Sequence, residues 1–228
     1  IKLLSISDKQ FNKRSFMDFS NINSLIEKGK SIQLHGGHRM NWEYGHWAVA
    51  KKMTLPWIGI YMKINNKAVG RLFYKIRNIG TTVLVSVQDF KTRAHLSFKT
   101  QYSMGLLADQ NPGEPSRAYW LNFFNRPAPF VTGPDKGARK NNTAVVFVRY
   151  VKIKRGYYRL DPEVITENAA DFEEGKLTLM YRDFLEETIR DNPDNYLWSH
   201  RRWKWDYQAE YQDKWIDTCP PPSMDIKL

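Results

Sequence analysis

The chain has 228 residues, 42% of them hydrophobic, and its charged side chains are dispersed along its length. This composition predicts one folded domain with a full core and excludes a disordered chain or a string of small modules. Purely apolar runs are short, such as 144–148, so none approaches the roughly 20 residues of a membrane-spanning helix. A net charge of +11 predicts an anionic partner, which leaves nucleic acid, an acidic protein and anionic lipid open.

The tryptophan and cysteine contents narrow the classes of partner and of site that the chain can have. Eight tryptophans are many for this length, and tryptophan favours places where an apolar surface meets water. Together with the positive charge, they favour an anionic membrane surface as a partner. The single cysteine, Cys219, excludes a disulfide framework and a cysteine-based metal site, and it predicts a reducing compartment.

The hydrophobic pattern predicts strands and helices that alternate along the chain. In order, we expect a helix over 21–28, a strand over 31–35, a helix capped by Asn41, a strand over 56–62, a helix over 67–78, a strand over 82–86, a helix over 92–99, a strand over 103–108, a helix over 134–141, strands over 143–153 and 157–165, and a helix over 176–190. Such alternation predicts an α/β fold with helices on the faces of a central sheet. The two successive late strands predict that the sheet is mixed.

A histidine and a glutamate lie where the strand over 31–35 gives way to the next helix. His38 follows two glycines, and Glu43 comes five residues later in the first turn of that helix. An imidazole, whose ordinary pKa is about 6.5, can take a proton from an alcohol, and a carboxylate on its other nitrogen fixes the tautomer. We therefore predict that His38 is a general base oriented by Glu43. No serine or cysteine lies in a recognisable nucleophile elbow, so we expect no covalent intermediate with the enzyme.

A metal site is an alternative use of the same histidines. His35, His38 and His46 are separated as H-x2-H and H-x7-H, spacings that do not place ligands on one helical face as H-E-x-x-H does. We therefore expect no metal at this position.

Four sequence blocks lie in the same order as in a known family. The block GHRMNWE contains His38 and Glu43 as an H-x4-E motif, and NKAVGRL, LLADQNP and FVTGP through ARK follow it. With LWSHRRW near the end, these blocks resemble lipid A biosynthesis acyltransferases of the lauroyl and myristoyl type. That family lies within the wider H-x4-D/E group of glycerol-phosphate acyltransferases. The NWE form is similar to Bacteroidetes-type members. The resemblance runs from about 3 to 204.

The resemblance implies an acyl transfer and its partners. The expected reaction moves a fatty acyl chain from acyl carrier protein, or from acyl-CoA, to a hydroxyl of a lipid A precursor, without a cofactor or metal. The expected place is the cytoplasmic face of the bacterial inner membrane. We expect an acyltransferase domain over 1–205 and a tail over 206–228. We also expect that Ile1 marks a truncated beginning, because the family normally has an upstream membrane anchor.

Five polar residues outside the His38–Glu43 pair are candidates for substrate binding. Arg71 and Arg77 lie on a basic helix, where they can bind phosphate, although a glycine precedes Arg71 where the family often has aspartate. Asp109 and Gln110 follow a buried strand, where polar side chains face the contents of a cleft. Arg139 ends a short helix and can also bind phosphate.

The same motifs and composition allow two other functions. The motifs do not separate lipid A from another lipid acceptor, such as a phospholipid, a glycolipid or an amino-acid lipid. The segment 196–205 interleaves cations with aromatic rings, which is also typical of proteins that bind single-stranded nucleic acid. No known RNA-binding motif is present, so we expect no nucleic-acid partner. An elongated apolar groove beside His38 would indicate an enzyme, whereas a continuous basic face without a groove would indicate a nucleic-acid-binding protein.

Overall fold

The computed structural model describes residues 2–39, 41–90, 92 and 98–222. Its strands are β1 (Ser15–Met17), β2 (Ile32–Gly36), β3 (Trp57–Tyr61), β4 (Thr82–Ser86), β5 (Ser103–Leu107), β6 (Tyr119–Phe123), β7 (Arg126–Phe130), β8 (Ala144–Lys154) and β9 (Tyr157–Thr166). Its helices are α1 (Asp8–Asn12), α2 (Ser20–Glu27), α3 (Trp42–Ala50), α4 (Lys67–Arg77), α6 (Gly133–Lys140) and α7 (Lys176–Asp191), with short 3-10 turns between them and after α7.

A seven-stranded sheet forms the centre of the molecule, with the strand order β1-β9-β8-β2-β5-β3-β4. The strands from β8 to β4 in this order run parallel, whereas β9 is antiparallel to β8. Two residues join β8 to β9, and the second of them, Gly156, has a φ of 80°, which a tight turn needs. The predicted α/β fold with a mixed sheet is confirmed.

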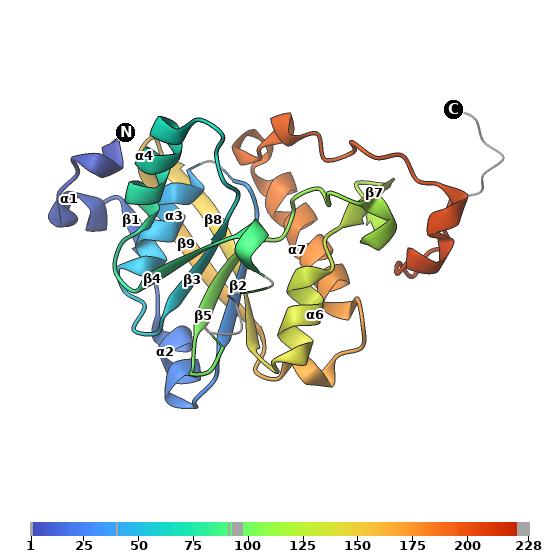
Figure 1. The fold of residues 1–228 in the computed structure, drawn as a ribbon, viewed down its shortest axis with the longest axis horizontal. Helices are drawn as coiled ribbons and strands as arrows, with labels where there is room; N and C mark the ends of the chain where they lie inside the picture. Colours follow the sequence, from blue (N-terminus) through green and yellow to red (C-terminus); the bar gives the residue numbers. More distant parts are fainter. Residues whose placement is uncertain (1, 40, 91, 93–97, 223–228) are drawn as a thin grey trace.

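Helices cover both faces of this sheet. In Figure 1, α3 and α4 lie on one side and α6 and α7 on the other. Because side chains alternate along a strand, Ile32 and Leu34 of β2 pack in the core beside α3, whereas His35 stacks on Phe147 and meets the edge of Tyr181 in α7. The two faces of β2 therefore serve two separate cores.

Most of the elements expected from the pattern are present, with bounds that differ by one or two residues. The helix expected over 92–99 falls largely outside the described residues. Asn41 occupies the N-cap position of α3, as expected. Its φ is 65° and its side chain makes no capping hydrogen bond, so the prediction that Asn41 caps the helix with its side chain is wrong.

The β6–β7 hairpin and the short strand β1 were not predicted. Pro127 and Pro129 lie inside β7, and proline argues against a strand because it cannot donate to a ladder. The turn between the two strands uses Phe124 and Asn125, both at positive φ, which is unusual for phenylalanine. The sequence therefore carries neither of the usual signals of a hairpin.

The residues after 205 pack against this hairpin. The ring of Tyr211 stacks on Trp120 at 5.1 Å between centroids, and the backbone amide of Ile216 donates to the Trp120 carbonyl. In the part of the chain that the structure describes, no helix is both long and apolar enough to cross a membrane.

Candidate active site

The register of two parallel strands brings His38 and Asp109 together. Gly36 of β2 pairs with Leu107 of β5, and the Ala108 amide donates to the Gly36 carbonyl at 3.1 Å. Continued by two residues, this register places His38 opposite Asp109. One carboxylate oxygen of Asp109 lies 2.7 Å from Nδ1 of His38, and the other accepts the backbone amide of His38 at 2.8 Å.

Asp109 is a fully buried carboxylate that both hydrogen bonds keep ionised. Burial acts to raise its pKa, but the hydrogen bonds from His38 and the charge of its ring outweigh burial and leave the pKa below its ordinary value. An ionised carboxylate only accepts, so Nδ1 of His38 donates to it and Nε2 of the neutral ring carries the free lone pair. Gly37 permits this close approach, because a Cβ there would lie 2.9 Å from Cδ1 of Leu185 and 3.4 Å from the carboxylate.

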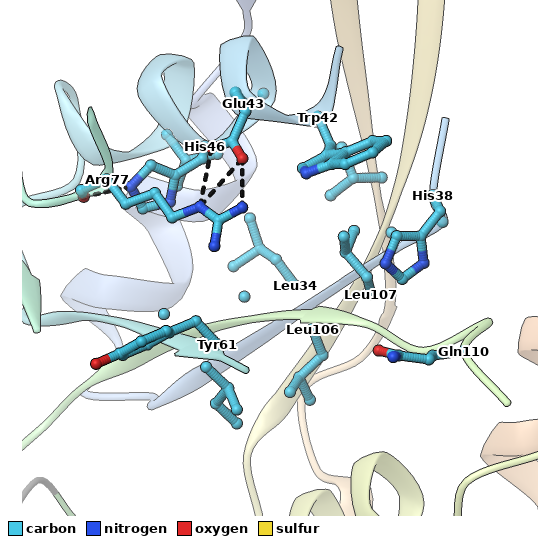
Figure 2. Close-up of a pocket in the computed structure, with 18 of the residues that line it drawn as sticks. Leu34, His38, Trp42, Glu43, His46, Tyr61, Arg77, Leu106, Leu107 and Gln110 are labelled. Carbon is cyan, nitrogen blue, oxygen red and sulfur yellow. Dashed lines mark hydrogen bonds and ion pairs between the residues drawn. The ribbon is translucent and has the colours of Figure 1, made fainter. Parts of the chain in front are cut away.

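Glu43 pairs with Arg77 and makes no hydrogen bond to His38 within the described structure. Nε of Arg77 lies 3.0 and 3.1 Å from the two carboxylate oxygens, and Nη2 lies 2.5 Å from one of them. The expected contact between Glu43 and His38 is therefore wrong: α4 supplies a full positive charge to Glu43, and Asp109 takes the place beside His38. Figure 2 shows Glu43 turned toward Arg77, with Trp42 between it and His38.

Two hydrogen bonds hold the end of α4 in position for this ion pair, and a third orients His46, which makes one of them. Nε1 of Trp47 donates to the carbonyl of Ile76 at 2.7 Å, and Nε2 of His46 lies 2.8 Å from the carbonyl of Arg77. Nδ1 of His46 accepts from Nε1 of Trp57 at 3.1 Å. Burial lowers the pKa of His46, which keeps the ring neutral and allows it to donate at one nitrogen and accept at the other.

The three histidines considered for a metal do not converge. Both ring nitrogens of His46 are engaged, and His35 faces the opposite side of the sheet from the cavity that His38 lines. Burial lowers the pKa of His35 to about 3. Over the described ranges, no cluster of three or more histidine, cysteine or carboxylate side chains is suited to a metal ion.

A cavity of about 470 Å³ lies between the sheet and helices α3 and α4, a volume within the usual range for small-molecule sites. Its walls are largely apolar and come from six strands, from α3, from the end of α4 and from loops at the strand ends. Leu34, Val49, Trp57, Leu106, Val148 and Leu160 are among the apolar residues. His38, Glu43 and Arg77 face this space in Figure 2. An apolar cavity with a histidine at its wall suits a fatty chain better than a nucleic acid.

The structure separates the predicted site residues into two groups. His38, Glu43, Arg77 and Gln110 line the cavity, and Asp109 lies directly behind His38. Arg71 is exposed on α4 and does not line the cavity.

Arg139 also lies away from the cavity. It belongs to α6, on the other side of the sheet, where its Nε contacts Asp135 at 3.0 Å and its Nη2 lies 3.7 Å from Glu174. These carboxylates neutralise it, and its position does not support the predicted role in phosphate binding.

The segment 196–202 holds the two loops that meet at the site, a role that the sequence did not reveal. The Leu197 amide donates to the carbonyl of His38 at 3.0 Å. Arg202 is buried and donates to the side chain of Asn111 at 2.9 Å and to the carbonyl of Pro129 at 2.7 Å. Burial lowers the pKa of Arg202 to about 10, so it remains a cation at neutral pH. Its position near Asp109 helps to compensate that buried charge.

We predict that Glu43 is energetically coupled to Arg77 and not to His38. In a double-mutant cycle of unfolding with Glu43→Gln and Arg77→Met, the coupling should be about 0.5–3 kcal/mol, as for partly buried partners in one network. The same cycle with Glu43→Gln and His38→Gln should give less than about 0.5 kcal/mol. Chemical denaturation measures both, and the reverse ranking of the two couplings would contradict the geometry.

Comparison with known proteins places the chain in a family. A family model described as bacterial lipid A biosynthesis acyltransferase matches residues 1–205, a range that contains the loops of His38 and Asp109 and the segment 196–202. A search of curated proteins finds no significant match. Since the family model covers most of the chain, the protein belongs to the bacterial lipid A biosynthesis acyltransferase family.

Proposed function

We propose that this acyltransferase moves a fatty acyl chain from the thioester of acyl carrier protein to a hydroxyl of a lipid A precursor, with His38 as the general base. The proposal rests on the two hydrogen bonds between Asp109 and His38 beside the apolar cavity. With Nδ1 bonded to the carboxylate, the neutral ring keeps Nε2 available for the proton of the acceptor hydroxyl.

The transfer takes two linked steps. Nε2 of His38 removes the hydroxyl proton while the oxygen attacks the thioester carbonyl, which forms a carbon–oxygen bond and a tetrahedral oxyanion. Collapse of the oxyanion breaks the carbon–sulfur bond, and the imidazolium returns the proton to the leaving thiolate. Asp109 stabilises the imidazolium between the two steps, because it is an ionised carboxylate in a buried place.

Arg77 is our candidate for stabilising the oxyanion. Its Nε and Nη2 donate to Glu43, whereas Nη1 makes no hydrogen bond in the described part of the chain. The guanidinium faces the cavity in Figure 2. In this proposal, Glu43 is a positioning residue that aims Arg77, and it does not act on the base.

The charge of the protein supports an acidic donor and an anionic location. A net charge of +11 suits an acidic acyl carrier protein as donor and an anionic membrane surface as the place of reaction. The proposed surface is the cytoplasmic face of the inner membrane. The NWE block at Glu43 also supports a Bacteroidetes-type member within the wider glycerol-phosphate acyltransferase group.

We predict that His38→Ala and Asp109→Asn each lower kcat by about 10²–10⁴-fold, the usual contribution of a general base and its partner. Asp135→Asn is the matched control, because Asp135 is also a buried aspartate but lies on the far side of the sheet. Rates are measured with acyl carrier protein as donor and a lipid A precursor as acceptor. Product mass identifies the acceptor hydroxyl and the chain transferred.

The same measurements distinguish the role of Glu43 from that of Asp109. Glu43→Gln should retain more activity than Asp109→Asn, because it leaves the His38 ring in place. Thermal melts of each variant confirm that the protein is folded. Full activity of folded His38→Ala would remove the base from the mechanism, and transfer only to another lipid would contradict the proposed acceptor.

We predict that Val49→Phe shifts the acyl preference toward shorter chains. Val49 is buried and lines the cavity, so a larger side chain fills space that the end of a long chain would use. The measurement is the ratio of kcat/KM for a donor of about ten carbons to one of about sixteen. Val85→Phe serves as the control, because Val85 packs in a separate cluster and does not line the cavity. An unchanged ratio in folded Val49→Phe would show that the acyl chain lies elsewhere.

A further inference from the structure

Exposed apolar side chains lie on α4 and in the segments beside it, and some of them also line the cavity. Among the described residues, large apolar side chains that are exposed concentrate between 62 and 87. We call six of them the α4 rim: Met62, Ile64, Val69, Leu72, Tyr74 and Val87. Met62, at 59% exposure, is the most exposed of the six. Soluble surfaces carry such side chains singly, so a group of this size indicates a contact surface.

Part of the α4 rim is continuous with the cavity that His38 lines. Met62, Ile64 and Val87 belong to the cavity wall as well as to the surface. Ile64 also packs against α4, since a Cβ at Gly70 would lie 3.8 Å from its Cβ. The Tyr74 ring meets Tyr61 of β3 at 6.4 Å between centroids. A chain lying on the part of the rim formed by Met62, Ile64, Tyr74 and Val87 can therefore reach the cavity along an apolar path.

Positive charge accompanies this apolar surface. The sequence has no aspartate or glutamate between Glu43 and Asp89. Lys67, Arg71 and Lys75 lie four residues apart on α4, on one side of the helix, and all three are exposed. No carboxylate within the described ranges pairs with any of these three cations. They are therefore available for anions outside the molecule.

We propose that the α4 rim docks on an anionic membrane and passes the lipid acceptor from the bilayer to His38. A helix with basic residues on one side and exposed aliphatic side chains beside them matches the interfacial helices that lie on anionic lipid. A carrier protein would match the charge, but the membrane also accounts for an apolar path from the surface into the cavity. The nature of the acceptor rests on the proposed function, whereas the docking does not.

Vesicle binding tests the surface without any reaction. The probes are vesicles of phosphatidylcholine with and without phosphatidylglycerol, and co-sedimentation measures the bound fraction. The double variant Val69→Glu with Leu72→Glu should lower binding to the anionic vesicles at least tenfold. Ile153→Glu is the matched control, because Ile153 is 59% exposed between two lysines on β8. It should bind as the unmodified protein does.

A second pair of variants tests the charge. Lys67→Gln with Lys75→Gln should weaken binding to the phosphatidylglycerol vesicles and reduce its dependence on salt, because fewer lipid phosphates are contacted. Binding to phosphatidylcholine alone should change little. Equal losses on both kinds of vesicle would contradict a role for these two cations in lipid recognition.

The activity of the double variant separates the possible outcomes. With the acceptor dispersed in detergent micelles, it should turn over at the unmodified rate, and with the acceptor in vesicles it should be slow. Normal vesicle binding together with a raised KM for acyl carrier protein would overturn the proposal, because the rim would then be the carrier's interface. If vesicle binding is lost as expected but the unmodified protein transfers no acyl chain, docking stands and the proposed function fails.

Discussion

A single buried carboxylate organises the site. Asp109 accepts one hydrogen bond from the His38 ring and another from the His38 backbone, so it fixes both the position of the loop and the orientation of the imidazole. A charge without contact to water is costly unless it is fully paired. The two hydrogen bonds and the nearby cation Arg202 supply that pairing. The loop after β2 and the loop after β5 are thereby held as one unit.

The fold places two carboxylates near one cavity and gives them different partners. Asp109 follows β5 and meets His38, whereas Glu43 begins α3 and meets Arg77 from α4. The first pair suits proton transfer, since it leaves one imidazole nitrogen free. The second pair suits the binding of negative charge, since it holds a guanidinium at the cavity wall. An H-x4-E spacing in the sequence does not by itself imply that its two side chains touch.

Local patterns predicted most of the strands and helices and the mixed sheet, because each of these depends on the spacing of apolar residues over a few positions. The partner of His38 was not predicted, because β2 and β5 are far apart in sequence and their register is a property of the whole sheet. Asp109 was expected at a strand end and in a substrate-binding role. Its position opposite His38 follows only once the two strands are known to be neighbours. The burial of Arg202 was equally invisible, because a cation in a basic tail usually lies in water.

The tautomer of His38 tests the central claim most directly. A long-range ¹H–¹⁵N spectrum of the histidine rings at about pH 8 distinguishes a protonated Nδ1 from a protonated Nε2 in the neutral imidazole. The account predicts that His38 carries its proton on Nδ1, that Asp109→Asn changes this signal, and that Glu43→Gln leaves it in place. A proton on Nε2, or a signal that responds to Glu43→Gln and not to Asp109→Asn, would contradict it.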